Sequence, residues 1–138
     1  MTGIYQHTLD SKGRLSIPAR LREDLGDTFY VTISMDKCLS AYSAESWKVF
    51  TDKINAMSYV KQNKMRPLSA LACRCEVDAQ GRILLPQYLR DFAGLDRDVT
   101  VVGCTNHAEF WDSQTWSPVC AVETTPENIK AVMEELEF

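Results

Sequence analysis

The sequence lacks the features of membrane and secreted proteins. No hydrophobic run approaches the roughly 18 to 20 residues that a membrane-spanning helix requires, and the N-terminal segment does not have the basic-then-apolar order of a signal peptide. We therefore expect a cytoplasmic protein that makes no membrane contact. The five cysteines include no C-x-x-C pair, so we expect reduced thiols and neither a disulfide framework nor a zinc ribbon.

Residues suited to catalysis are equally scarce. The chain has two histidines, His7 and His107, and neither a G-x-G-x-x-G nor a P-loop motif. His7 falls in an alternating pattern typical of a packed strand, and no acid-base pair is evident. Cys73 and Cys75 have no second cysteine pair at ligand spacing, and the other three cysteines are scattered. We expect no catalytic residues, no metal site and no cofactor.

The negative charge is concentrated at the C-terminal end. The net charge is -4, but residues 1–104 carry 14 Lys and Arg against 12 Asp and Glu, whereas residues 105–138 carry 1 against 7. Four cations and no acid lie between Lys61 and Arg74. A locally positive face is therefore compatible with the acidic total, and the net charge does not exclude a nucleic-acid partner.

An internal repeat dominates the sequence. The segment DSKGRLSIPARLREDLGDTFYVTI, which begins at Asp10, aligns at an offset of 68 with DAQGRILLPQYLRDFAGLDRDVTV, which begins at Asp78, and nine of the 24 positions are identical. After one inserted residue the match resumes weakly and pairs Trp47 with Trp116. The chain therefore consists of two copies of one unit, a connector and a tail.

Each copy begins with a strand, a tight turn and a return strand. Alternation puts Tyr5, His7 and Leu9 on one side of the first strand, with Cys73, Cys75 and Val77 equivalent in the second copy. The D-x-x-G-R segment predicts a turn in which the aspartate accepts backbone N–H groups and the glycine takes a positive φ. The residues that build it are Asp10, Gly13 and Pro18 in the first copy and Asp78, Gly81 and Pro86 in the second.

Short helices and further strands follow in each copy. We expect Pro18 and Pro86 at the first helical position and Gly26 and Gly94 just past the end of each helix. Expected strands span residues 29–34, 39–42, 99–102 and 108–111, and helices are expected after Ser43, after Asp112, within 61–71 and after Thr125. The last helix has an apolar stripe, Ile129, Val132, Met133 and Leu136, that suits either the core or a subunit contact.

These elements indicate a β-rich α+β fold. Neither copy alone offers enough apolar area for a stable core, so we expect the two to interlock as one pseudo-two-fold β-barrel with flanking helices. The expected organisation is a first repeat at residues 3–47, a helical connector at 48–70, a second repeat at 71–117 and an acidic helical tail at 118–138.

Two arginines occupy equivalent places just after the turns. Arg14 and Arg82 could reach a phosphate or the O6/N7 edge of guanine with both guanidinium arms. They could equally pair with Asp10 and Asp78 as structural salt bridges, and the residues alone favour neither interpretation.

The double D-x-x-G-R-φ-x-φ-P-x-x-L-R pattern, present as DSKGRLSIPARLR and DAQGRILLPQYLR, resembles the MraZ family of bacterial transcriptional regulators. These proteins are tandem relatives of AbrB/SpoVT swapped-hairpin DNA-binding domains. The similarity runs from about residue 3 to Trp116 and includes the strand end Glu109-Phe110-Trp111-Asp112. It implies a nucleoid-associated, ring-forming protein, of about octamer size, that binds direct repeats in double-stranded DNA upstream of the division and cell-wall gene cluster and represses it.

The resemblance also implies which residues touch DNA. They are Lys12 and Arg14 in the first motif and Arg82 in the second, with Arg20 and Arg22 as weaker candidates. Gln80 stands where the first copy has Lys12, which indicates unequal use of the two turns. The alternative function is an AbrB-like protein-interaction or assembly module of the antitoxin type, although the short, regular C-terminal stripe does not favour a toxin-wrapping extension.

Overall fold

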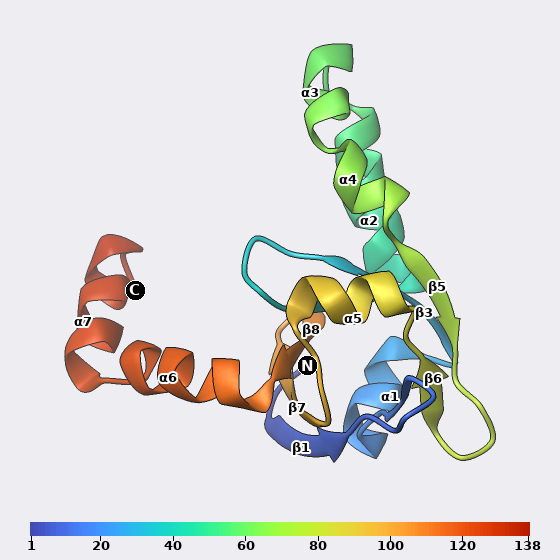
Figure 1. Ribbon diagram of the computed structural model, residues 1–138. Coiled ribbons are helices and arrows are strands. Elements are labelled where there is room, and N and C mark those ends of the chain that lie inside the picture. Colours follow the sequence, from blue (N-terminus) through green and yellow to red (C-terminus); the bar gives the residue numbers. More distant parts are fainter.

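The order of secondary structure elements repeats along the chain. A computed structural model describes all residues, 1–138 (Figure 1). The first half contains β1 (Ile4–Thr8), β2 (Arg14–Ser16), α1 (Ala19–Leu25), β3 (Thr28–Ile33), β4 (Leu39–Ser43), α2 (Ala44–Asn55), α3 (Tyr59–Lys64) and α4 (Arg66–Ala70). The second contains β5 (Cys73–Glu76), β6 (Arg82–Leu84), α5 (Gln87–Ala93), β7 (Asp98–Cys104), β8 (His107–Asp112), α6 (Ser113–Glu123) and α7 (Pro126–Glu135). The α+β class and the tandem repeat are confirmed.

The short helices α1 and α5 start one residue later than expected. Pro18 and Pro86 are N-cap residues, with ψ angles of 135° and 150°, so their backbone is extended and the helices begin at the next residue. Gly26 and Gly94 end these helices as predicted, and both have a positive φ. Each helix buries two apolar side chains one turn apart, Leu21 with Leu25 and Leu89 with Ala93. The repeated proline and glycine therefore delimit two equivalent helices.

The two copies exchange their first strands. All pairings in the six-stranded sheet, ordered β1-β7-β8-β4-β3-β5, are antiparallel. Strand β1 of the first copy pairs with β7 of the second, and β5 of the second copy pairs with β3 of the first. The chain does reverse at each D-x-x-G-R turn, but within the first copy only a single bridge, Leu9 to Leu15, joins the two arms. Neither repeat is therefore complete without the other.

The expected barrel is not closed by hydrogen bonds. Strands β1 and β5 lie at the two edges of the sheet, and each has one partner strand in it. Beyond the turns the chain leaves this sheet, and β2 and β6 pair with each other as a separate two-stranded sheet. Because these three-residue strands form a sheet only with each other, they do not join the two edges of the larger sheet. The pseudo-two-fold relation remains in the β2/β6 pair, which takes one strand from each copy.

One hydrophobic core unites both repeats. It contains 18 buried residues from both copies, among them Leu15 and Ile17 of the first and Ile83 and Leu85 of the second. A small separate cluster of Cys38, Val102 and Trp111 packs with Trp116 on the other side of the sheet. Shared burial makes the two repeats a single unit of stability.

The remaining helices project from this core as two arms (Figure 1). Ser43, Asp112 and Thr125 cap α2, α6 and α7 through their side-chain oxygens, as predicted. The helix expected within 61–71 is two short helices, because Pro67 lacks the N–H needed to continue α3. The apolar stripe of α7 is exposed, so it is not part of the core. No helix here has the length and apolar character needed to cross a membrane.

Candidate nucleic-acid interface

Asp10 organises the first turn through both of its carboxylate oxygens. Its Oδ1 accepts hydrogen bonds from the backbone N–H of Lys12 at 3.0 Å and of Arg14 at 2.9 Å. Its Oδ2 accepts one from the Arg14 Nε at 2.7 Å. The carboxylate therefore holds the turn backbone and the arginine side chain together.

The second turn repeats this arrangement. Asp78 accepts from the backbone N–H of Gln80 and of Arg82, both at 2.9 Å, and from the Arg82 Nε at 3.1 Å. Both expected salt bridges thus exist, but each uses only Nε: the terminal nitrogens of the two guanidinium groups make no hydrogen bond within the chain. In each turn the aspartate holds the arginine side chain through Nε and leaves the two terminal guanidinium nitrogens available to a ligand.

The hydrogen bonds of each turn also lower the pKa of its aspartate. The pKa values of Asp10 and Asp78 lie below the ordinary 3.8, first because the backbone N–H groups of Arg14 and Arg82 stabilise the carboxylates. A lowered folded-state pKa means that the stabilisation is complete above the ordinary value and is lost as the pH falls through the lowered one. At neutral pH both carboxylates are therefore ionised, and the stabilisation of both turns is complete.

Replacing Asp10 by alanine is expected to loosen the first turn. The backbone amides of Lys12 and Arg14 lose their acceptor, so their hydrogen exchange should become faster while the exchange of core amides is unchanged. Amide exchange followed by NMR measures this effect. Asp52→Ala, which removes an exposed carboxylate from α2, is the matched control and should leave both amides protected. Equal exchange in the two variants would show that the carboxylate does not hold the turn.

Each turn docks onto the other copy. The Ile17 N–H donates to the Gly81 carbonyl at 2.9 Å, and the Leu85 N–H donates to the Gly13 carbonyl at 2.8 Å. Gly13 and Gly81 have φ angles of +83° and +77°, and a Cβ at Gly13 would lie 3.0 Å from the Leu85 carbonyl oxygen. Glycine is required here by both the backbone angle and the close approach.

The helix arginines differ in position from the turn arginines. Arg90 donates from Nε to the Leu85 carbonyl at 3.0 Å, and its guanidinium lies against Gly13. Arg22 lies equivalently against Gly81, with its Nε buried and without a hydrogen-bond partner. Arg20 is exposed on α1 and borders a depression shared with Glu23 and Asp24. The structure thus places Arg22 beneath the opposite turn and Arg20 beside two acids.

The β2/β6 sheet brings Arg14 and Arg82 to one surface. In its register Arg14 lies opposite Leu84 and Ser16 lies opposite Arg82. All four side chains point away from the core, while Leu15 and Ile83 between them are buried. Diagonal neighbours of this kind lie roughly 7–8 Å apart between Cα atoms. Two arginines 68 residues apart in the sequence therefore share one face, an arrangement that equivalent turn positions alone did not predict.

The structure also gathers one group of metal-ligating side chains away from this surface. Cys104, His107 and Glu109 meet on the β7–β8 hairpin, with their ligand atoms within 4.8 Å of one another. Burial raises the pKa of the Cys104 thiol to about 12, so it is protonated at neutral pH. The spacing C-x-x-H-x-E could have indicated this group in the sequence. The three residues come together because the β7–β8 hairpin pairs Cys104 with His107.

The exchanged strands, the two equivalent short helices and the two arginine turns define an α+β protein built from a tandem repeat. The model of the family described as "MraZ protein, putative antitoxin-like" matches residues 1–70 and again residues 68–126. This chain belongs to the MraZ family.

Curated relatives resemble the chain over most of its length. A protein of Carboxydothermus hydrogenoformans is 44% identical over 121 residues, which cover 86% of this chain and 85% of the relative. One from Caldicellulosiruptor saccharolyticus is 39% identical over 140 residues, 99% of this chain and 98% of the relative. One from Alkaliphilus metalliredigens is 43% identical over 117 residues, 83% of this chain and 82% of the relative. All three are named "Transcriptional regulator MraZ".

Proposed function

We propose that this protein is a transcriptional repressor that binds short direct repeats in double-stranded DNA upstream of the division and cell-wall gene cluster. The observation that carries the proposal is the β2/β6 sheet, which has Arg14 and Arg82 on one face, with the terminal nitrogens of both guanidinium groups unbonded within the chain. The names of the relatives support a regulatory function, and the same names support a protein that is not an enzyme.

The shape of this surface suits the major groove of DNA. The groove admits a two-stranded β-ribbon, and arginine is the residue that most often contacts the O6 and N7 atoms of guanine with two hydrogen bonds. Lys12, exposed at the tip of the first turn, would contact a backbone phosphate. Because Gln80 replaces this lysine in the second turn, the first turn would bear more of the phosphate contact.

A ring of identical chains would supply the affinity that one chain lacks. Lys12, Arg14 and Arg82 are few cations in a protein of net charge -4, so a single chain should bind weakly. In a homo-oligomeric ring of about octamer size, neighbouring chains would engage successive repeats, and avidity would raise affinity by about 100- to 10,000-fold. Such a regulator would act in the cytoplasm, associated with the nucleoid.

Binding of the purified protein to its own upstream DNA tests this function. We expect affinity for DNA with tandem repeats to exceed that for a single repeat by about 100-fold or more, because linked sites are engaged together. Affinity should also fall steeply with salt, with a slope of about -0.9 in log–log form for each phosphate that the protein neutralises. Fluorescence anisotropy at two or more salt concentrations measures both, with a scrambled duplex of equal length as the control. Equal affinity for all three duplexes would contradict the proposal.

A second candidate is a protein-interaction or assembly module of the antitoxin type; its support is the exposure of the α7 stripe, which the sequence left open between core and subunit contact. Four apolar side chains are exposed there, and the family to which the chain belongs is described as antitoxin-like. A protein that shows no preference for its upstream DNA but binds a partner through α7 would support this alternative over the repressor.

A further inference from the structure

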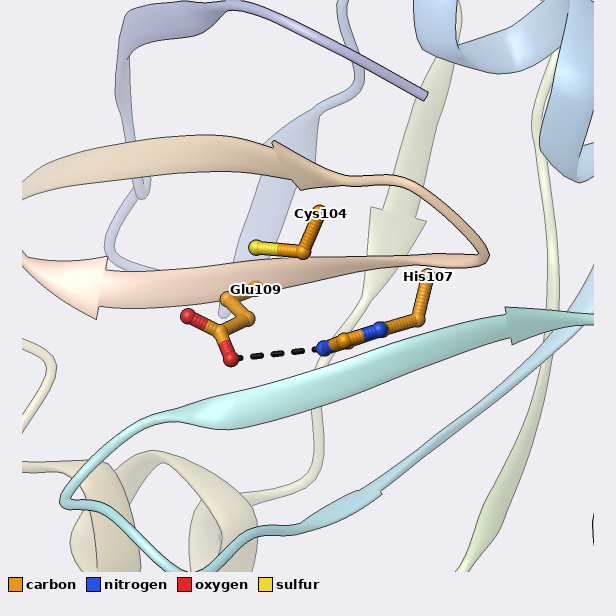
Figure 2. A group of neighbouring side chains, drawn as sticks. All are labelled: Cys104, His107 and Glu109. Atoms are coloured by element: carbon orange, nitrogen blue, oxygen red, sulfur yellow. Dashed lines mark hydrogen bonds and ion pairs between the residues drawn. The ribbon is translucent and has the colours of Figure 1, made fainter. Parts of the chain in front are cut away.

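The β7–β8 hairpin places three different metal-ligating side chains on one face (Figure 2). Cys104 of β7 pairs directly with His107 of β8, and paired residues of antiparallel strands project to the same side. Glu109 follows two residues later on β8 and so shares that side. The ligand atoms of a thiol, an imidazole and a carboxylate thereby lie within 4.8 Å of one another on the six-stranded sheet, and not on the β2/β6 sheet.

We propose that Cys104, His107 and Glu109 bind a divalent transition metal ion of the Zn²⁺ type, and that the thiol proton of Cys104 is released to solvent as the metal–sulfur bond forms. These three side chains are the ones that Zn²⁺ prefers, at distances of about 2.0–2.3 Å. His107 Nε2 and Glu109 Oε2 lie 3.3 Å apart. That separation is long for a hydrogen bond, and it is close to the roughly 3.3 Å that two N or O ligands span at a tetrahedral zinc centre.

Two further contacts orient these ligands. His107 Nδ1 lies 2.9 Å from Asn106 Oδ1, and the Trp111 Nε1–H donates to Glu109 Oε1 at 2.9 Å. These contacts engage Nδ1 of His107 and Oε1 of Glu109, so that Nε2 of His107 and Oε2 of Glu109 face each other and one metal ion could be bound by both. Metal-binding histidines and carboxylates are held in this way by partners at their second atom.

A neighbouring ring restricts the His107 side chain, and a cavity lies beside two of the three residues. The Tyr42 ring stacks on the His107 ring with centroids 5.5 Å apart, which limits rotation of the imidazole. His107 and Glu109 also line a cavity of about 400 Å³ with Tyr42, Phe50 and Leu68. Three protein ligands leave a fourth tetrahedral position for water or for another ligand. The cavity beside His107 and Glu109 would give this fourth ligand room.

Another pair of thiols must be distinguished from this group. The Sγ atoms of Cys73 and Cys75 lie 4.0 Å apart on β5, but the chain places no histidine or carboxylate with them in a group of three. Two thiols alone make an incomplete site, which a soft metal ion could nevertheless occupy weakly. Cys73→Ser is therefore the matched control for Cys104→Ser.

The test is a titration of the reduced, metal-free, full-length protein with Co²⁺, followed by displacement with Zn²⁺. Tetrahedral cobalt bound by a thiolate produces a sulfur-to-metal charge-transfer absorption that identifies the ligand. We expect one Co²⁺ per chain with this absorption in the unmodified protein and in Cys73→Ser. The absorption should disappear in Cys104→Ser, and the affinity should fall at least 10-fold in His107→Gln.

Asn106→Ala provides a variant that removes no ligand. Asn106 is exposed in the β7–β8 turn, so the fold should tolerate the change, and loss of its contact should weaken Co²⁺ binding by about 10- to 100-fold. Thermal melts establish that each variant is folded. The proposal is overturned if the unmodified protein shows no charge-transfer absorption, if the absorption survives in Cys104→Ser, or if it is lost in Cys73→Ser instead.

Discussion

Replacing Arg14 by alanine is expected to abolish specific DNA binding while the protein still folds and assembles. One bidentate contact between arginine and guanine contributes about 1–3 kcal/mol, which is roughly 5- to 150-fold in affinity. In the proposed ring each chain carries the same change, so the losses would multiply when two neighbouring repeats are bound together. Arg14 is about one-third exposed, and only its Nε is engaged within the chain, so its removal leaves the core intact. Fluorescence anisotropy with the tandem-repeat duplex measures the loss.

Two further variants separate recognition from charge. Arg66→Ala removes one positive charge from α4, on the arm that projects from the core, and should weaken binding only slightly (Figure 1). Arg14→Lys keeps the charge but loses the planar fork, so it should lose most of the sequence preference and retain salt-sensitive, non-specific binding. If Arg14→Ala binds the duplex as tightly as the unmodified protein, the arginine serves only to brace the turn, and the proposed interface is wrong.

Replacing Ile83 by alanine is expected to destabilise both repeats together. Its side chain is 1% exposed at the centre of β6, where it lies opposite Leu15 of the first copy. Truncating a buried isoleucine to alanine costs about 2–5 kcal/mol, because transfer energy is lost and a cavity remains. That is a large part of the roughly 5–15 kcal/mol by which a domain of this kind is stable. Thermal unfolding should show a single transition, lowered by on the order of 10 °C.

The same substitution at Ile4 is the matched control. Ile4 is 54% exposed on the edge strand β1, so Ile4→Ala should change stability by no more than about 0.5 kcal/mol. All measurements require equal protein concentration, because the proposed assembly would raise the melting temperature. Two separate transitions in Ile83→Ala, one of them unshifted, would contradict a single shared core.

Local patterns predicted most of the secondary structure. Alternation placed Leu15, Ile17, Ile83 and Leu85 toward the core, because successive strand residues face opposite sides whatever the strand pairs with. Ser43, Asp112 and Thr125 identified three helix starts, since a side-chain oxygen caps the backbone next to it. The one-residue error at Pro18 and Pro86 arose because proline fits both the first helical position and the N-cap.

The sequence did not predict which strands pair with each other. The turn at Asp10 predicts a reversal, yet β1 pairs with β7 and β2 pairs with β6, and both partners lie more than 60 residues away. The open edges of the sheet followed from the same pairing and not from any residue pattern. Similarly, Cys104 was one of several scattered cysteines until the β7–β8 register placed it opposite His107.

The sequence by itself determined the repeat, the turn chemistry and the identity of the arginines, because these depend on residues within a few positions of one another. Only the tertiary structure decided that Arg14 and Arg82 share one surface and that Cys104, His107 and Glu109 share another. The physical reason is that strand pairing joins backbone groups that are alike in every residue, so its register is selected by burial of the whole apolar core rather than by any local motif.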